Sequence, residues 1–287
     1  MTFVEFARAH GLEIDRLRSG DRIFRCPTTA HPRSRNGAYA FDGKRGWVQN
    51  WETGESLQWW NDPTARPWSD AEKRDWERKR QRDAAERAAL AKRAADEARE
   101  LIGSATMAPH NYLTAKGLDA RGLVTPDYVL VVPMRGIDDG QLRGAQTIAL
   151  VENQWRKKFV YGTRAKGAVL RIGPARATES YLVEGYATGL SVEAAARRLC
   201  LSAAVYVTFS ADNLAHVAPL IRGRRYVIAD NDASGTGQRV AEATGLPWVM
   251  SDRVGEDAND LHQRAGVMAL AKLIMQCRRA RDGGRAA

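Results

Sequence analysis

The sequence predicts a mixed α+β protein whose C-terminal part is an α/β domain, with a parallel sheet covered by helices on both faces. Two observations predict this fold class. Between about residues 178 and 276, apolar runs of strand length alternate with Ala-rich stretches of helical length, as is typical of parallel sheets. Earlier in the chain, an aromatic, glycine-punctuated segment precedes a long charged run of helix formers. We therefore expect a small β-rich domain, a long helix and an α/β domain, in that order.

The first domain is expected to span residues 1–65. Its middle, from Gly37 to Gly54, alternates like paired strands, and Asp42-Gly43 and Thr53-Gly54 are typical turn pairs. Such a pattern predicts an antiparallel sheet.

Basic and aromatic residues of this domain are candidates for contact with single-stranded DNA. Arginine neutralises phosphates and tryptophan stacks on bases, so the candidates are Arg22, Arg25, Trp47 and Trp51. Aromatic side chains also build the cores of small β domains, and both interpretations stay open.

Zinc is not predicted. Cys26 and His31 are at most half of a structural zinc site, which takes four ligands, and no second cysteine follows at zinc-ligand spacing. The remaining cysteines, Cys200 and Cys277, form no close pair, which is typical of a reducing compartment.

Residues 66–104 are predicted to form a linker helix. The run is rich in helix formers with nearly balanced charge, and Ser69 followed by Glu72 is similar to a capping box. Alanines recur at positions 84, 88, 91, 95 and 98, on a narrow seam that buries little area. We expect a semi-rigid linker, with a coiled-coil dimer as the alternative.

Residues 105–177 are strongly basic towards their end. Between Trp155 and Thr178 there are seven basic residues and no acidic one. Any one of these side chains is more simply explained as solvated surface. As a block beside carboxylates, they indicate binding of a phosphate backbone or a triphosphate.

Carboxylates follow two predicted strands of the domain at residues 178–277. Glu184 follows one strand, and Asp230 and Asp232 follow another. Ligands gather at the carboxyl ends of parallel strands, and three carboxylates placed there repel one another unless a divalent cation lies between them. The sequence therefore predicts a Mg²⁺ site, with Mn²⁺ as an alternative.

A third acidic segment precedes the last predicted helix, which is expected to span Leu261 to Cys277. Asp257 and Asp260 could complete the cation site or cap that helix, since Asp is favoured at N-caps. For Asp260 the two interpretations are even. For Asp257, which we expect to precede the cap, metal binding is favoured.

These segments together resemble a TOPRIM domain. The strings Glu184-Gly-Tyr-Ala-Thr-Gly189 and Ala211-Asp-Asn-Leu-Ala-His-Val-Ala218 narrow the resemblance to primases of phages, conjugative plasmids and related mobile elements. The resemblance implies that the catalytic residues are Glu184, Asp230 and Asp232, and that Asp257 and Asp260 join them as metal ligands.

The segment before this domain resembles the basic polymerase subdomain that precedes TOPRIM in primases. By that resemblance Lys158 and Lys166 match two lysines that line the nucleotide and template groove. Arg135, Arg143 and Lys157 are further candidates for the same groove. Cellular primases carry a zinc ribbon that this chain lacks, which leaves its template specificity open.

The function implied by the resemblance is that of a DNA primase, a DNA-directed RNA polymerase that makes short RNA primers by metal-dependent nucleotidyl transfer. The implied partners are a single-stranded DNA template, nucleoside triphosphates and a replicative helicase. Two alternatives stay open. One is a TOPRIM nuclease, and the other is a non-catalytic accessory protein that binds single-stranded DNA in replication or conjugation.

Charge and hydropathy agree with a nucleic-acid partner. The formal net charge is +10, which favours an acidic partner. No apolar run approaches a membrane span and no signal-peptide core follows Met1, so we expect a bacterial cytoplasmic protein with no membrane partner. The basic tail at residues 278–287 is predicted to be disordered.

Overall fold

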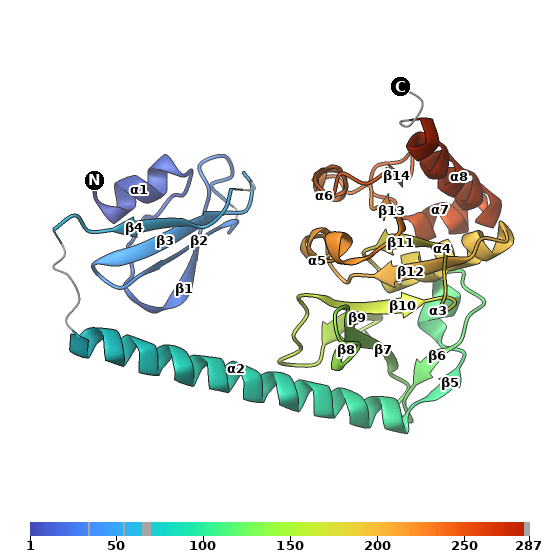
Figure 1. Ribbon diagram of the computed structural model, residues 1–287, viewed down its shortest axis with the longest axis horizontal. Coiled ribbons are helices and arrows are strands. Elements are labelled where there is room, and N and C mark those ends of the chain that lie inside the picture. The colour runs from blue at the N-terminus through green and yellow to red at the C-terminus, as the bar shows by residue number, and fades with distance from the viewer. Residues whose placement is uncertain (34, 54, 65–69, 284–287) are drawn as a thin grey trace. The chain divides into compact units, whose positions relative to one another are not determined.

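The chain divides into two compact units, residues 1–79 and 80–287 (Figure 1). The computed structural model describes residues 1–33, 35–53, 55–64 and 70–283.

The first unit consists of a short helix and an antiparallel sheet. The elements are α1 (Phe3–Ala9), β1 (Gly20–Cys26), β2 (Gly37–Phe41), β3 (Arg45–Asn50) and β4 (Gln58–Asn61), with the strands in sequence order across the sheet. Phe3 of α1 stacks on Phe41 at a centroid distance of 4.7 Å and lies edge-on to Trp60 at 5.6 Å. These rings join one face of the sheet to the helix, and the predicted β-rich domain is confirmed.

The predicted turn at Asp42-Gly43 is confirmed. The Asp42 carboxylate accepts hydrogen bonds from the backbone N–H groups of Lys44 (2.8 Å) and Arg45 (2.7 Å), as Asp side chains do in tight turns. Gly54, of the second predicted turn, lies outside the described residues.

The second unit is built on a ten-stranded mixed sheet, in the order β14-β13-β11-β12-β10-β7-β6-β5, with β8 on β7 and β9 on β8. The bounds are β5 (Thr106–Ala108), β6 (Gly122–Val124), β7 (Leu130–Gly136), β8 (Leu142–Val151), β9 (Gln154–Phe159), β10 (Ala168–Ile172), β11 (Glu179–Val183), β12 (Ala203–Val207), β13 (Arg224–Ala229) and β14 (Trp248–Met250). Strands β11 to β14 pair in parallel, which confirms the predicted parallel sheet.

Strand β10 joins the basic segment to the parallel strands. Its residues 168–169 pair with β7, and its residues 170–172 pair antiparallel with β12. The segments predicted as separate polymerase and TOPRIM domains therefore share one continuous sheet.

Helices cover both faces of the parallel strands (Figure 1). The helices are α3 (Asn111–Ala115), α4 (Tyr186–Arg198), α7 (Ala258–Ala265) and α8 (Val267–Gly283) on one side, and α5 (Ala211–Val217) and α6 (Thr236–Ala243) on the other. Along β11, Tyr181 and Val183 join the core on the first side and Leu182 joins the core on the second. This alternation buries the whole strand, as expected between two helical layers.

The C-terminal helix differs from the prediction in two ways. A single helix was expected from Leu261, but Gly266 at φ 79° separates α7 from α8. The predicted disordered tail is wrong for residues 278–283, because α8 continues to Gly283 and Arg278 Nε lies 3.2 Å from the buried carboxylate of Glu179.

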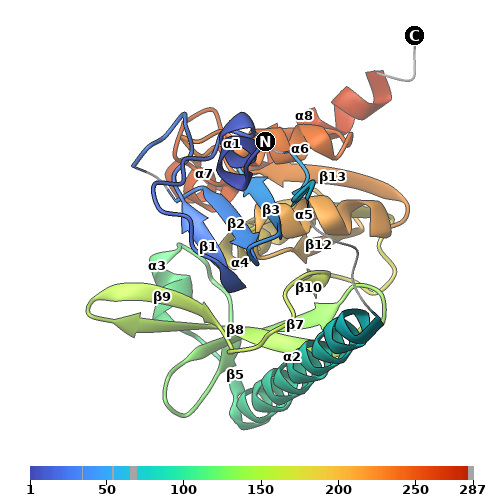
Figure 2. The same cartoon turned by 90° about the vertical axis from the view of Figure 1, so that its left-hand side faces the viewer.

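Helix α2 (Asp70–Ser104) forms where a linker helix was predicted. Ser69 of the predicted cap lies outside the described residues. In the second half of the helix, Ala94 and Ala98 are completely buried against Val131, Ala145 and Val160. Figure 2 shows this half beside β7 and β8. Only Ala98 of these two belongs to the predicted seam, so the packing surface is centred on a different line of the helix. The prediction of a linker is wrong for this half.

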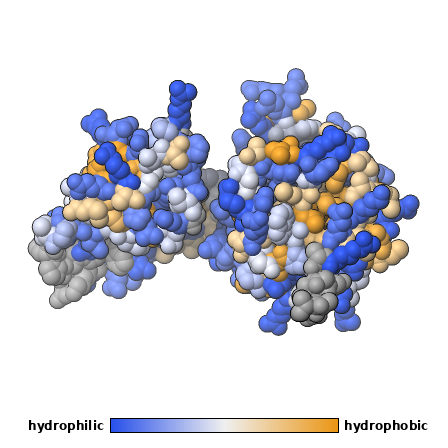
Figure 3. Space-filling view, turned by 90° about the horizontal axis from the view of Figure 1, so that it is seen from above, coloured by the Kyte–Doolittle hydropathy of each residue, from blue (hydrophilic) through white to orange (hydrophobic). Residues whose placement is uncertain are grey.

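The surface is mixed in character. In the view of Figure 3, hydrophobic residues are interspersed among hydrophilic ones on each unit. None of the described helices is long and apolar enough to cross a membrane.

Candidate active site

Three acidic segments meet at the carboxyl ends of the parallel strands. Glu184 directly follows β11 and Asp230 directly follows β13, and these two strands are neighbours. The third segment is held there by backbone hydrogen bonds, from Asn231 N–H to the Glu256 carbonyl (3.1 Å) and from Gly255 N–H to the Asn231 carbonyl (2.6 Å). The fold therefore brings together the segments that the sequence predicted to be neighbours.

Asp230 is the most perturbed carboxylate of this group. Its Oδ1 atom is buried and has no hydrogen-bond partner among the residues that the structure describes. Burial raises the pKa of Asp230 to about 7, and the negative charges of Asp257, Glu184, Asp232 and Asp260 act in the same direction. A buried oxygen without a donor, surrounded by other carboxylates, is a suitable ligand for a cation.

The surroundings of Glu184 also disfavour its ionised form. Burial raises its pKa above the ordinary value, the charges of Asp232 and Asp212 add to this, and Lys157 opposes it. Glu184 and Asp230 are thus the two acidic groups that gain most from a bound cation.

Asp232 lies in the same cluster but points to the start of α6. Burial alone would raise its pKa, yet hydrogen bonds from the Ser234 hydroxyl and the N–H groups of Gly237 (2.7 Å) and Thr236 (3.2 Å) lower it to about 2. Glycine is required at 237, because a Cβ there would overlap the Asp230 carbonyl oxygen. The ionised form of Asp232 is therefore favoured, and both of its carboxylate oxygens accept hydrogen bonds from residues at the start of α6.

Asp257 and Asp260 form a capping box at the start of α7. Asp257 is the N-cap itself, so the expectation that it precedes the cap is wrong. Its Oδ1 accepts from the N–H groups of Asn259 (2.7 Å) and Asp260 (2.9 Å), and its Oδ2 accepts from the Thr188 hydroxyl (3.1 Å). Asp260 pairs with Lys116 at 3.4 Å. Asp257 and Asp260 therefore cap α7 and also contribute negative charge near Asp230, since both raise the pKa of Asp230.

The donor chemistry fits a hard divalent cation. Among the described residues, no group of three His, Cys, Asp or Glu side chains is placed to hold a metal ion. Asp232 and Asp257 direct oxygens to backbone amides. Asp230 Oδ1 is nevertheless without a partner, and carboxylate oxygens are the ligands that Mg²⁺ and Mn²⁺ prefer.

Strand β9 presents Lys157, not Lys158, to the carboxylates. One face of the strand carries Trp155, Lys157 and Phe159, because every second residue of a strand points to the same side. On this face Trp155 packs against Tyr112, and Phe159 lies edge-on to Phe209. Lys157 Nζ lies 5.4 Å from the centre of the Tyr112 ring. Lys158 lies on the opposite face, so the structure places the sequence's leading candidate away from Glu184.

Lys166 is positioned by a buried asparagine. The next residue, Gly167, donates its N–H to Asn213 Oδ1 (2.7 Å), and Asn213 Nδ2 donates to the carbonyls of Ala168 (2.8 Å) and Thr208 (2.7 Å). These bonds fasten the Lys166 loop to the start of α5, beside the carboxyl end of β12. They also explain the asparagine in the string that begins at Ala211.

The two candidate arginines of the hairpin between β7 and β8 are already engaged. Arg135 donates to the Gly140 carbonyl (3.2 Å), and Arg143 pairs with Asp138 (3.1 Å) and Asp139 (2.6 Å). These contacts stiffen the hairpin, so both arginines are weaker candidates for nucleotide contact than Lys157 and Lys166.

The candidates for single-stranded DNA lie in the first unit. Trp51 is 45% exposed, and the Arg25 guanidinium lies 3.7 Å from the centre of its ring. Trp47 is half-buried and pairs across strands with the exposed Trp59, while Arg22 lies over Phe24 at 5.2 Å. Neither Trp47 nor Trp51 belongs to the core of this unit, so the core interpretation of these two residues is wrong.

Sequence reasoning missed three polar residues of the second unit that shape the site. Asp212 places a charge near Glu184, Thr188 holds Asp257, and buried Asn259 donates to the Lys116 carbonyl (2.8 Å) and to Ser191 (3.0 Å). Thr188 and Asp212 lie within the two strings that carry the resemblance, and Asn259 lies between Asp257 and Asp260. That position was the only signal that could have found them.

Comparison with known proteins identifies the second half of this unit. Residues 179–268 match the family model described as Toprim domain. No curated protein sequence matches the chain significantly.

Two solved structures have a distant likeness to the chain. The structure of the DnaG catalytic core has 17% identity and a TM-score of 0.37, covering 62% of this chain and 68% of that one. The DnaG primase catalytic domain bound to ssDNA has 16% identity and a TM-score of 0.37, covering 66% and 74%.

The parallel sheet and its carboxylate edge define the class of this protein as one with an α/β domain whose acidic side chains gather at the carboxyl ends of parallel strands. More particularly, residues 179–268 form a TOPRIM domain, as the sequence predicted. This domain contains Glu184, Asp230, Asp232, Asp257 and Asp260.

Proposed function

We propose that this chain is a DNA primase that joins nucleotides on a single-stranded DNA template. The observation that supports this most is the placement of Lys157 opposite the carboxylates, on a sheet that is continuous with theirs. Its charge acts on Glu184, and β9 connects through β8, β7 and β10 to the TOPRIM strands. A cation site beside a basic strand is suited to binding a triphosphate between them.

Glu184 and Asp230 are the proposed primary ligands of Mg²⁺ or Mn²⁺, with Asp232, Asp257 and Asp260 supplying further negative charge. When bound, such a cation lowers the pKa of an attacking 3′-hydroxyl and offsets charge on the leaving pyrophosphate. Lys157 and Lys166 hold phosphates of the incoming nucleotide or template as point charges. Pairing with the template base selects the nucleotide, so the protein needs no base-reading motif.

The test is primer synthesis by the full-length protein. Purified protein is incubated with single-stranded DNA, labelled nucleoside triphosphates and Mg²⁺ or Mn²⁺, and short products are resolved on a gel. We expect template-dependent products that disappear in Glu184→Gln, which removes a charge and keeps the shape of the side chain.

Other outcomes would contradict the primase assignment. Shortening of the template without nucleotides would identify a TOPRIM nuclease. DNA binding that survives in EDTA and in Glu184→Gln, with no product on varied templates, would identify a non-catalytic accessory protein.

A pair of variants on β9 tests which of its two adjacent lysines contacts the nucleotide. We expect Lys157→Ala to raise the KM for nucleoside triphosphate about tenfold or more, because a charged contact contributes roughly 1.5–3 kcal/mol. Lys158→Ala removes the same charge from the opposite face of the same strand and should change KM less than about threefold. Equal effects, or a larger effect of Lys158→Ala, would contradict the assigned role of Lys157.

A further inference from the structure

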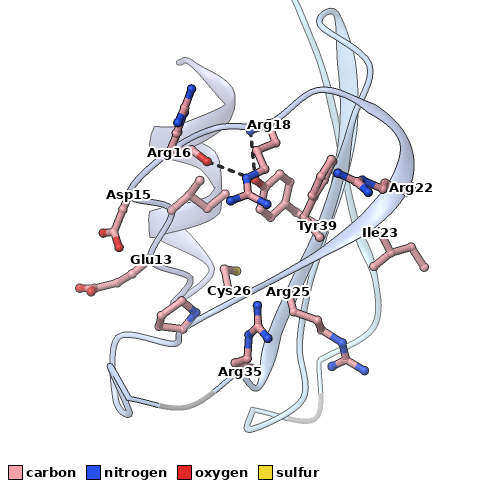
Figure 4. A pocket seen from close by; sticks show the side chains of 13 residues that line it. Glu13, Asp15, Arg16, Arg18, Arg22, Ile23, Arg25, Cys26, Arg35 and Tyr39 are labelled. Atoms are coloured by element: carbon pink, nitrogen blue, oxygen red, sulfur yellow. Dashed lines mark hydrogen bonds between the residues drawn. The ribbon is translucent and has the colours of Figure 1, made fainter.

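The first unit contains a pocket that takes no part in the chemistry proposed for the TOPRIM domain. It has a volume of about 450 Å³ and lies between the loop at residues 13–18 and strand β1 (Figure 4). Because β1 is the edge strand of its sheet, the loop lies beside it without pairing along its length. The cavity is of the size that small organic ligands occupy, which is roughly 300–1,000 Å³.

Arginine is the most frequent residue type in the lining of this pocket. Five arginines contribute to it: Arg16, Arg18, Arg22, Arg25 and Arg35. Figure 4 shows the guanidinium groups of Arg18 and Arg35 directed into the space between loop and strand, while the carboxylates of Glu13 and Asp15 point away from it.

The charge of these arginines is not balanced within the described part of the chain. Among the residues that the structure describes, none of the five guanidinium groups forms an ion pair with a carboxylate. Like charges gathered around one cavity repel one another, and an anion bound between them would remove that repulsion. The arrangement therefore indicates a ligand that carries negative charge.

The pocket is held in shape before any ligand binds. The hydroxyl of buried Tyr39 accepts a hydrogen bond from the backbone N–H of Arg18 (3.1 Å) and donates one to the backbone carbonyl of Arg16 (3.5 Å). The Tyr39 ring stacks on Phe24 at a centroid distance of 5.3 Å. Arg22 lies over the Phe24 ring and Arg25 over Trp51. Side chains that are already ordered lose less entropy on binding.

We propose that this pocket binds the phosphate groups of a nucleotide, either free or within single-stranded DNA. Arginine suits phosphate because its planar fork can donate two parallel hydrogen bonds to two oxygens. Phe24 and Tyr39 also line the pocket. This proposal does not depend on primase activity, because no TOPRIM carboxylate and no metal takes part.

The experiment measures binding by the full-length protein in EDTA, so that metal-dependent binding at the TOPRIM site does not contribute. The probes are inorganic pyrophosphate, ATP and an oligodeoxythymidylate, each titrated by calorimetry at two salt concentrations. The pocket variant is Arg18→Gln with Arg35→Gln. The control is Arg8→Gln with Arg33→Gln, which removes two exposed charges of the same unit that do not line the pocket.

We expect the pocket variant to bind at least one probe about tenfold or more weakly, and the control to change affinity less than about threefold. For the oligonucleotide, the slope of log affinity against log salt should fall by about 0.7 for each phosphate that the variant no longer neutralises. Weaker binding of pyrophosphate, ATP and the oligonucleotide together indicates recognition of a phosphate group alone. An effect confined to ATP indicates a free nucleotide, and an effect confined to the oligonucleotide indicates DNA.

Equal affinities of the pocket variant and the control for all three probes would overturn the proposal. Circular dichroism establishes that the variants are folded. If the Gln variant does not fold, Arg18→Lys with Arg35→Lys keeps the charge and removes the planar fork. That variant should still bind more weakly than the control, and unchanged affinity would overturn the proposal equally.

Discussion

Replacement of Asp230 by Asn is expected to reduce primer synthesis by at least about a thousandfold and, in metal-free protein at pH 8, to stabilise the fold. The reduced activity follows if Asp230 is a cation ligand whose removal disables transition-state stabilisation. The gain in stability has a separate cause. Asp230 Oδ1 is buried without a partner, and at pH 8 the carboxylate is charged beside four other acidic residues.

The pH dependence of this gain has a definite sign. The pKa of Asp230 is about 7 in the folded protein against an ordinary value of 3.8. Because the folded-state pKa is higher than the unfolded value, the folded protein binds the proton more tightly than the unfolded chain does. The stability that this proton contributes is fully present below about pH 4 and is lost as the pH rises through 7. The free energy of unfolding gained by Asp230→Asn should therefore be smallest below about pH 4, increase as the pH rises towards 7, and be on the order of 1–3 kcal/mol at pH 8.

Mg²⁺ should reverse the order of stability. A cation that binds only the folded wild type stabilises it by about 2.7 kcal/mol at a hundred times Kd, whereas the variant should respond little. Urea unfolding at pH 5 and pH 8, in EDTA and in Mg²⁺, measures all four conditions. Asp127→Asn, at an exposed position, is the matched control. A pH-independent effect, or a full Mg²⁺ response in Asp230→Asn, would contradict the role given to Asp230.

Replacement of Asn213 by Ala is expected to lower the free energy of unfolding by about 2–5 kcal/mol. The buried side chain makes three hydrogen bonds, and its removal strands the N–H of Gly167 and the carbonyls of Ala168 and Thr208. Each buried polar group left without a partner costs about 1–3 kcal/mol, partly recovered by relaxation. The same bonds hold the loop that carries Lys166, so activity should fall beyond what the unfolded fraction explains.

The comparison for this variant is Asn111→Ala, at an exposed position of the same unit. Urea unfolding gives the free energies, and primer synthesis is measured at a temperature where both variants are folded. Unfolding free energies within about 0.5 kcal/mol of each other would show that the Asn213 bonds contribute little. Normal activity in a destabilised Asn213→Ala variant would show that catalysis does not depend on the position of the loop that carries Lys166.

The parallel sheet and its acidic edge were predictable from the sequence because they depend on local periodicity. Apolar runs such as Tyr181 to Val183 have the length of a buried strand, and the ends of parallel strands must lie at one edge of the sheet. Glu184 and Asp230 were therefore predictable as neighbours without knowledge of any side-chain direction.

The direction of individual side chains at this site was not predictable. Adjacent lysines at 157 and 158 differ by one residue, and the faces of a strand alternate with a period of two. Only the pairing of β9 with β8 decides which lysine faces Glu184. In the same way, Asp257 became a cap because α7 begins three residues earlier than the periodicity predicted.

The sequence by itself determined the order of the domains, the alternation of strand and helix over residues 178–276 and the edge at which carboxylates gather, since these follow from local hydrophobic patterns. Only the tertiary structure decided that β10 joins the basic segment to the TOPRIM strands, and that Ala94 and Ala98 pack against Val131. The arginine pocket beside β1 likewise combines residues from a loop, an edge strand and Arg35. Such contacts join residues distant in the chain, and their free energy depends on packing that no local pattern encodes.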